Sequence, residues 1–449
     1  MSTFFSPDND QLRRCADRVL NDAKRQGADN AVVSVARGQR RTLRTRHGEI
    51  DTLIQNQHQG LSLTLFYGQR TGSVSVTQLT DDALDNAVTA AGTLARYGDA
   101  DPWSGLPDPQ QQATDIVDLK LFHPQTLTVE EALRLARETE EAMNSAHRGR
   151  CLSEGAEITS YQGEFILANS QGFCAGYPSS SHTLMGHALA QNASGRQQGF
   201  WHDVQRSPLR LAAPQTIGHI AADRAVAQLG AAPLATRRCP VIFEAPVAHS
   251  LVHHLVAALS GGALYRSASF LGLCEGETIT ASHLSLREDP FLEGGWASGC
   301  FDGEGVAGNV REVITHGVAC GYFLGSYSAR RLGRRSTGNA SGAWNLTLSS
   351  TCHHPQNDLS ALLRQMHRGL LVTALLGNGV NPVTGDYSQG VAGLWIENGE
   401  IQAPVTGITI AGNLKTLWQR CIALGSDAYT RGALTCGSLL IDDMQIAGQ

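Results

Sequence analysis

The sequence contains very little lysine. Lys24, Lys120 and Lys415 are its only lysines, and all other Lys or Arg positions in the 449 residues are arginines. We interpret this bias as genomic composition first and function second. Acidic residues outnumber basic ones, and the formal net charge is −6. The overall charge therefore does not favour binding to nucleic acid or to an anionic membrane surface.

Long apolar runs and paired cysteines are missing as well. No run approaches the roughly 18 apolar residues of a membrane-spanning helix. Residues 1–14 lack the charged and apolar segments of a signal peptide. The ten cysteines are scattered without a CxxC pair, so we expect free thiols in a reducing compartment. These absences predict a cytoplasmic protein that binds neither membrane nor nucleic acid.

The residues that are present predict an α+β fold. Helical periodicity alternates with strand-like runs in the first half, which predicts an α/β layered domain over residues 1–115 and a middle region, 116–235, packed with it. From 236 to 449, short strands are punctuated by glycine, which predicts a mostly antiparallel β domain with a few helices. Four helices are expected in the first half, at 8–26, 80–97, 128–146 and 213–229.

Three histidines form the densest cluster of candidate ligands. His249, His253 and His254 lie within six residues of a predicted helix. Residues four apart share one helical face, so His249 and His253 could bind a metal, with Cys436 as a soft third ligand. No carboxylate lies between them to act as the general base of a zinc peptidase. The spacing favours the alternative, which is a polar helix surface beside a cavity or a partner, with no ion.

Other candidates come from loops. Arg330 and Arg331 open a run of arginines that could hold a peptide carboxylate, or form a solvated loop. Residues 377–393 are rich in glycine but lack the Lys-Ser/Thr of a phosphate-binding loop. Asp386 and Tyr387 in that segment are interpreted as a structural or cavity-lining corner.

Two further groups could supply carboxylates or metal ligands. Asp302 and Glu304 could bind a cation or act as acid and base, although two such residues on a glycine-rich loop more often form a turn. Cys352, His353 and His354 are a further possible ligand set, but the proline that follows them favours a loop.

The chain resembles the TldD/PmbA family, and within it the PmbA (TldE) type. The resemblance covers essentially the whole length and is densest in the second half. It is carried by VIFEAPVAHSLVHHLVAALSGGALYRSASFL, FDGEGV, SYSARRLG followed by STGNASG, GNGVNPVTGDYSQGVAGLWIENGEI, ITIAGNLKTLW and CGSLLIDDMQIAGQ. A series of matches in this order is far more specific than any one of them.

The family's catalytic TldD-type subunit carries an HExxxH zinc motif, which the PmbA type lacks. Aligned by its flanks, this chain has His253 at the first histidine, His254 at the glutamate and Ala258 at the second histidine. Anchored on His249 instead, Ser250 takes the glutamate position and His254 that of the second ligand. The flank-based register needs no gap, and the general base is missing in both.

The resemblance therefore implies a subunit without its own catalytic site, metal or cofactor. Its partner would be a TldD-type subunit that holds zinc, and the two would act on extended or unfolded peptides such as peptide-toxin precursors and antitoxins. Alone, the chain could form a homodimer. The cavity or peptide-binding candidates are His249, Arg330, Arg331, Asp386 and Tyr387.

Two alternatives stay open. The first is an independent metallopeptidase with His249, His253 and Cys436 as ligands. In that case Glu244 or Glu304 would replace the missing base, although Cys436 also matches the family's own cysteine ligand. The second is a regulatory protein that acts indirectly on DNA gyrase, a function suggested by older naming in the family.

Overall fold

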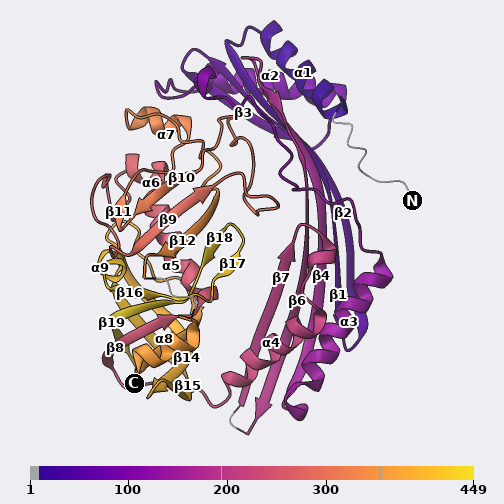
Figure 1. Ribbon diagram of the computed structural model, residues 1–449. Coiled ribbons are helices and arrows are strands. Elements are labelled where there is room, and N and C mark those ends of the chain that lie inside the picture. The colour runs from indigo at the N-terminus through magenta and orange to yellow at the C-terminus, as the bar shows by residue number, and fades with distance from the viewer. Residues whose placement is uncertain (1–9, 194, 353–355, 449) are drawn as a thin grey trace.

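The protein consists of a long curved N-terminal part (residues 10–227) and a more compact C-terminal part (residues 237–448), joined by a short connection (Figure 1). The computed structural model describes residues 10–193, 195–352 and 356–448. The architecture is mixed α and β, as the sequence predicts, with one sheet in the N-terminal part and two in the C-terminal part. Within these described ranges, no helix is both long and apolar enough to cross a membrane.

The N-terminal sheet is antiparallel throughout and has the order β3-β2-β1-β4-β6-β7, with β5 paired to β4. Its central strands are long, although glycines and polar residues interrupt their sequence pattern. The strands are β1 (Asn30–Arg46), β2 (Glu49–Tyr67), β3 (Arg70–Val76), β4 (Cys151–Asn169), β5 (Cys174–Ala175), β6 (Pro178–Asn192) and β7 (Gly195–Gln205).

Four helices cover one face of this sheet, close to the predicted bounds. They are α1 (Asp10–Arg25), α2 (Asp81–Tyr97), α3 (Val129–Ser145) and α4 (Pro214–Ala227). On β1, Val33 and Val35 lie in the core under α1 and α2, and Leu43 lies in the core under α3. Side chains alternate along a strand, so both helix pairs occupy the same face. Thr128 starts α3 with a reciprocal capping box to Glu131.

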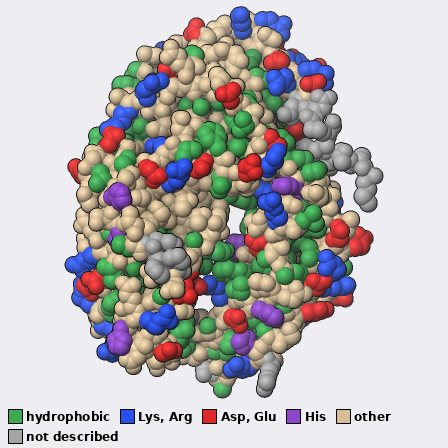
Figure 2. All heavy atoms as spheres, in the orientation of Figure 1, with side chains coloured by type: hydrophobic (Ala, Val, Ile, Leu, Met, Phe, Trp, Pro, Cys, Tyr) green, Lys and Arg blue, Asp and Glu red, His purple; other side chains and the backbone are tan. Residues whose placement is uncertain are grey.

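The opposite face of the sheet is only partly covered. Phe165 and Tyr177 pack there against Phe301 of the C-terminal part, with ring centroids 5.9 and 5.7 Å away. The even-numbered residues of β1 lie on this side, including Arg40 and Arg44. The space-filling view shows openings between the two parts of the molecule (Figure 2).

The C-terminal part contains two six-stranded sheets, ordered β11-β10-β9-β12-β18-β17 and β15-β14-β13-β8-β19-β16. The pairings are antiparallel except for β12–β18 and β13–β8. The strands are β8 (Arg237–Phe243), β9 (Leu284–Asp289), β10 (Arg311–Thr315), β11 (Val318–Ala319), β12 (Asn345–Ser350), β13 (Gly369–Leu376), β14 (Asp386–Glu397), β15 (Glu400–Asn413), β16 (Cys421–Leu424), β17 (Tyr429–Arg431), β18 (Leu434–Cys436) and β19 (Leu439–Ala447).

Short helices connect and cover these sheets. They are α5 (Ala245–Ala258), α6 (Gly261–Tyr265), α7 (Ser326–Arg331), α8 (Leu359–Met366) and α9 (Leu414–Gln419). Asn398-Gly399, a residue pair typical of tight hairpins, joins β14 to β15, and both residues have the positive φ that this turn requires (53° and 75°).

Candidate functional site

Helix α5 begins directly after β8 and carries the histidine cluster. Pro246 stands in its first turn, where its missing N–H costs no hydrogen bond. Leu251, Val252 and Leu255 form the buried side of the helix and belong to the largest core cluster of the protein. This packing fixes the rotation of α5, and it places the three histidines in three different environments.

His249 is buried and makes structural hydrogen bonds. Its Nε2 donates to the carbonyl oxygens of Tyr429 and Leu434, at 3.0 and 3.1 Å, and burial lowers the pKa of the imidazole. With Nε2 protonated and shared between two carbonyls, the lone pair of the imidazole is on Nδ1, which is buried and has no hydrogen-bond partner among the described residues. His249 therefore connects α5 to β17 and β18.

His253 and His254 lie farther toward solvent. His253 is exposed, and His254 is half-buried with its ring centroid 6.5 Å from that of Tyr387. Burial lowers the pKa of both imidazoles, and the neighbouring His253 contributes to the effect on His254. Ala258 is buried in the core at the end of the helix.

A zinc site in a protein needs three or four His, Cys, Asp or Glu ligands close together. Cys436 is fully buried, and burial raises the pKa of its thiol to about 12. Across the described ranges, no group of three or more His, Cys, Asp or Glu side chains is placed to hold a metal ion. His249, His253 and Cys436 do not form a ligand set. Of the candidate set at 352–354, Cys352 is exposed and the two histidines lie outside the described residues.

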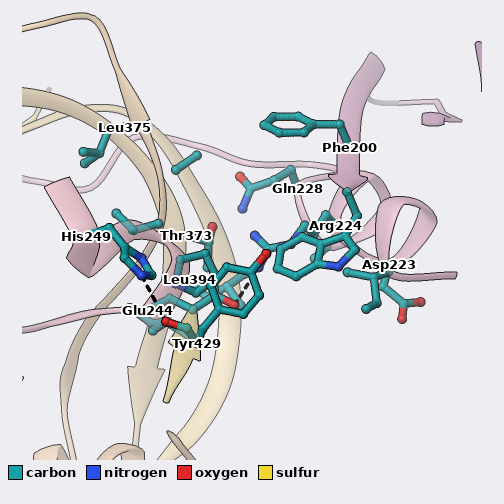
Figure 3. A pocket seen from close by; sticks show the side chains of 18 of the residues that line it. Phe200, Asp223, Arg224, Gln228, Glu244, His249, Thr373, Leu375, Leu394 and Tyr429 are labelled. Carbon is teal, nitrogen blue, oxygen red and sulfur yellow. Dashed lines mark hydrogen bonds and ion pairs between the residues drawn. The ribbon is translucent and has the colours of Figure 1, made fainter. Parts of the chain in front are cut away.

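A cavity of about 860 Å³ lies between the two parts of the molecule, beside α5. Figure 3 shows side chains from both parts pointing into it, among them Phe200 and Arg224 from the N-terminal part and Thr373 and Tyr429 from the C-terminal part. His249, Ser250 and His253 line the α5 side. The remaining lining is largely apolar and includes Val247, Leu371, Leu375, Leu394 and Ile401.

An ion pair spans this cavity between the two parts. Arg224 of α4 donates to Glu244 at the start of α5, at 2.8 Å, and both side chains are largely buried. The guanidinium also lies over the ring of Trp201, 4.5 Å from its centroid, and Trp201 contacts Tyr429. Burial raises the pKa of Glu244, and Arg224 opposes this shift. Arg224 therefore holds one oxygen of Glu244, whereas Oε2 has no hydrogen-bond partner among the described residues.

A second hollow, of about 520 Å³, shares His253 with the first. Glu304 and Tyr327 line it, so it brings His253 and Glu304 to the same hollow. Glu304 accepts the backbone N–H of Ser326 at the start of α7. Asp302 is buried, accepts three backbone N–H groups, and has a pKa raised by burial to about 6. Both carboxylates shape the loop that holds α7.

The other candidates lie away from the main cavity. Arg330 donates to the carbonyl oxygens of Trp103, Gly105 and Leu106, at 2.6 to 3.1 Å, so it links α7 to the long connection after α2. Arg331 is exposed and lies over the Tyr265 ring.

Asp386 and Tyr387 form a corner at the start of β14. Asp386 accepts hydrogen bonds from Thr384 and Asn413, which lower its pKa. Tyr387 is buried, and its hydroxyl has no hydrogen-bond partner among the described residues.

Three residues of the cavity have no recognisable signal in the sequence. Trp201, Arg224 and Tyr429 come from a strand, a helix and a strand far apart in the chain. Each has the pattern of an ordinary amphipathic element, and only the tertiary structure brings them together.

Comparison with known proteins identifies the family. Models of PmbA/TldA metallopeptidases match in sequence order: domain 1 over residues 31–95, the central domain over 122–229 and the C-terminal domain over 236–448. Metalloprotease PmbA of Escherichia coli O157:H7 is 38% identical over 422 residues, which cover 94% of this chain and 93% of that protein. The chain belongs to the PmbA/TldA metallopeptidase family.

Other relatives support the PmbA/TldE type. A metalloprotease PmbA homolog of Haemophilus influenzae is 36% identical over 438 residues, which cover 98% of this chain and 96% of that protein. The crystal structure of TldE from Thermococcus kodakarensis superposes with a TM-score of 0.83 at 20% identity, covering 97% of this chain and all of that one. At this identity the second match shows the shared fold.

Proposed function

We propose that this member of the PmbA/TldA family is the non-catalytic subunit of a two-chain zinc peptidase. A TldD-type chain would supply the zinc ion and the water that it activates. This chain would help to enclose the chamber and admit extended or unfolded peptides. The observation that carries the proposal is helix α5, where His253, His254 and Ala258 stand at the positions of the HExxxH motif, so that no carboxylate is present to act as base.

The surroundings of α5 support this role. The two carboxylates that could replace the base are both engaged, Glu244 by Arg224 and Glu304 by the backbone of Ser326. The cavity beside α5 has walls from both parts of the chain and is large enough for several peptide side chains. Helix α5 lacks the glutamate and the second histidine of the HExxxH motif but lies beside a cavity. This combination is expected of a subunit that binds peptides without cleaving them.

Hydrolysis of an unstructured fluorogenic peptide tests the proposal. We expect no hydrolysis and no stoichiometric zinc for the purified chain alone. Mixing with a TldD-type chain that has an intact HExxxH motif should give chelator-sensitive activity. Replacing the motif glutamate of that partner by glutamine should abolish activity, while His253→Ala in this chain should reduce it by less than tenfold.

The alternative hypothesis, an independent metallopeptidase, makes the opposite predictions. An independent metallopeptidase would show chelator-sensitive hydrolysis and bound zinc in the chain alone, and His253→Ala would remove both. Elemental analysis of the wild-type chain and this variant separates the two cases, because it does not depend on finding the correct peptide.

A further inference from the structure

Two hollows adjoin along strand β7, at the edge of the N-terminal sheet. The interdomain cavity and a smaller hollow of about 310 Å³ share Gln198, Gly199 and Phe200 as lining. Arg44 and Arg46 of β1 line the smaller hollow. A ligand that passes Phe200 would therefore contact both the cavity and the two arginines.

The cavity side of this junction is apolar. Phe200 is 52% exposed at this junction, so its apolar ring is accessible to a ligand. In Figure 3 its ring points into the space that Leu375 and Leu394 border from the C-terminal part. An aromatic or branched aliphatic side chain that enters there would exclude water from three apolar groups at once.

The charges around the two hollows are not balanced. Glu244 pairs with Arg224, and Asp223 lies 2.7 Å from His147, whereas Glu154 accepts a hydrogen bond from the neutral amide of Gln198, which leaves its charge uncompensated. The side chains of Arg44, Arg46 and Arg431 are exposed and have no ion pair or hydrogen bond within the described ranges. Four arginines and three carboxylates line the two hollows, so their formal charge is +1, which complements an anionic ligand.

We propose that these hollows form a side-chain recognition site for peptides in which a bulky apolar residue has acidic neighbours. The apolar side chain would enter the cavity past Phe200, and the flanking carboxylates would pair with Arg44 and Arg46 at one end and Arg431 at the other. The inference rests on the proposed function for its choice of peptides as ligands. This chain would then select among peptides without needing zinc.

Isothermal titration calorimetry of the full-length chain with three blocked pentapeptides tests the site. The probes are acetyl-Glu-Gly-Phe-Gly-Glu-amide, its glutamine counterpart (both Glu replaced by Gln) and its alanine counterpart (Phe replaced by Ala). We expect the first to bind about tenfold more tightly than either counterpart at low ionic strength, and the advantage over the glutamine peptide to shrink as salt screens the arginines.

Substitutions of exposed side chains test the location of the site without disrupting the fold. Phe200→Ala should remove the advantage over the alanine peptide, and the double variant Arg44→Gln with Arg46→Gln should remove most of the advantage over the glutamine peptide. Matched controls are Tyr97→Ala, an aromatic side chain 89% exposed on α2, and Arg14→Gln, an exposed arginine on α1. Both controls should bind like the wild type.

The outcomes separate this inference from the proposed function. Equal affinity for the three peptides, or unchanged binding by the Phe200 and arginine variants, would overturn the recognition site even if mixing with a TldD-type chain gives hydrolysis. Selective binding by the lone chain, without hydrolysis in any mixture, would overturn the two-chain peptidase and leave the recognition site standing.

Discussion

Histidine shows how strongly the surroundings of a residue decide its role in this protein. His249 and His253 lie one helical turn apart on α5, yet His249 bonds two carbonyls in the core and His253 is exposed on two hollows. The four-residue spacing places both toward one side of the helix. It does not reveal that β17 and β18 supply acceptors for only one of them.

His182 on β6 makes the stability of the N-terminal sheet depend on pH. Its side chain is buried, its Nδ1 lies 2.9 Å from the hydroxyl of Ser160, and its Nε2 has no partner in the described structure. Burial lowers its pKa from 6.5 to about 4. The unfolded chain therefore takes up a proton near pH 6.5, and the folded chain does so only near pH 4. The free energy of unfolding falls as the pH drops through this window.

We expect His182→Gln to remove part of this dependence. The thermal-unfolding midpoint of the wild type, measured by differential scanning calorimetry, should fall further between pH 7 and pH 5 than that of the variant. Replacement of His219, which is exposed on α4, by glutamine is the control and should leave the wild-type difference intact. Equal falls for the wild type and His182→Gln would contradict the assignment.

At the scale of elements, small residues bring α4 close to the sheet. Gly218 of α4 lies against α3, whereas Ala221 and Ala225 are buried on the side that faces the sheet. Gly199 of β7 lies opposite them, and a Cβ atom there would come within 2.4 Å of the backbone of α4. This close approach places Arg224 of the same helix over Trp201 and within reach of Glu244.

Gly199→Ala should therefore force α4 away from β7. We expect the free energy of unfolding, measured with urea, to fall by about 1–3 kcal/mol, the usual cost of overpacking. Gly262→Ala is the control, because its nearest neighbour, at 3.3 Å, is the flexible end of Arg266. If the two variants lose the same stability, the close contact between α4 and β7 is not what Gly199 provides.

At the scale of the whole molecule, the segment after α2, residues 98–127, contacts the C-terminal part and helps to hold the two parts together. Arg330 binds three of its carbonyls, and Tyr327 donates to Asp101 of the same segment at 2.9 Å. These bonds start from α7, so they attach the N-terminal part to the C-terminal part at the end opposite the α4–α5 contact (Figure 1).

Arg330→Ala should loosen this attachment. Three carbonyls would lose their donor, and limited proteolysis should cut the segment from 98 to 127 at least several-fold faster than in the wild type. Arg331→Ala is the matched control, since the adjacent guanidinium is exposed, lies over Tyr265 and donates no hydrogen bond to this segment within the described ranges. Equal cleavage rates in the two variants would show that Arg330 does not hold the connection.

The sequence by itself determined the α+β class, the four N-terminal helices, the Asn398-Gly399 hairpin and the absence of a carboxylate within the α5 cluster. These features follow from local patterns, because side-chain periodicity, turn chemistry and residue identity are written into short segments. Tertiary structure alone decided which groups are engaged. Arg224 meets Glu244, and Arg330 meets Trp103, only after folding, because charge pairing and burial depend on neighbours far apart in the chain.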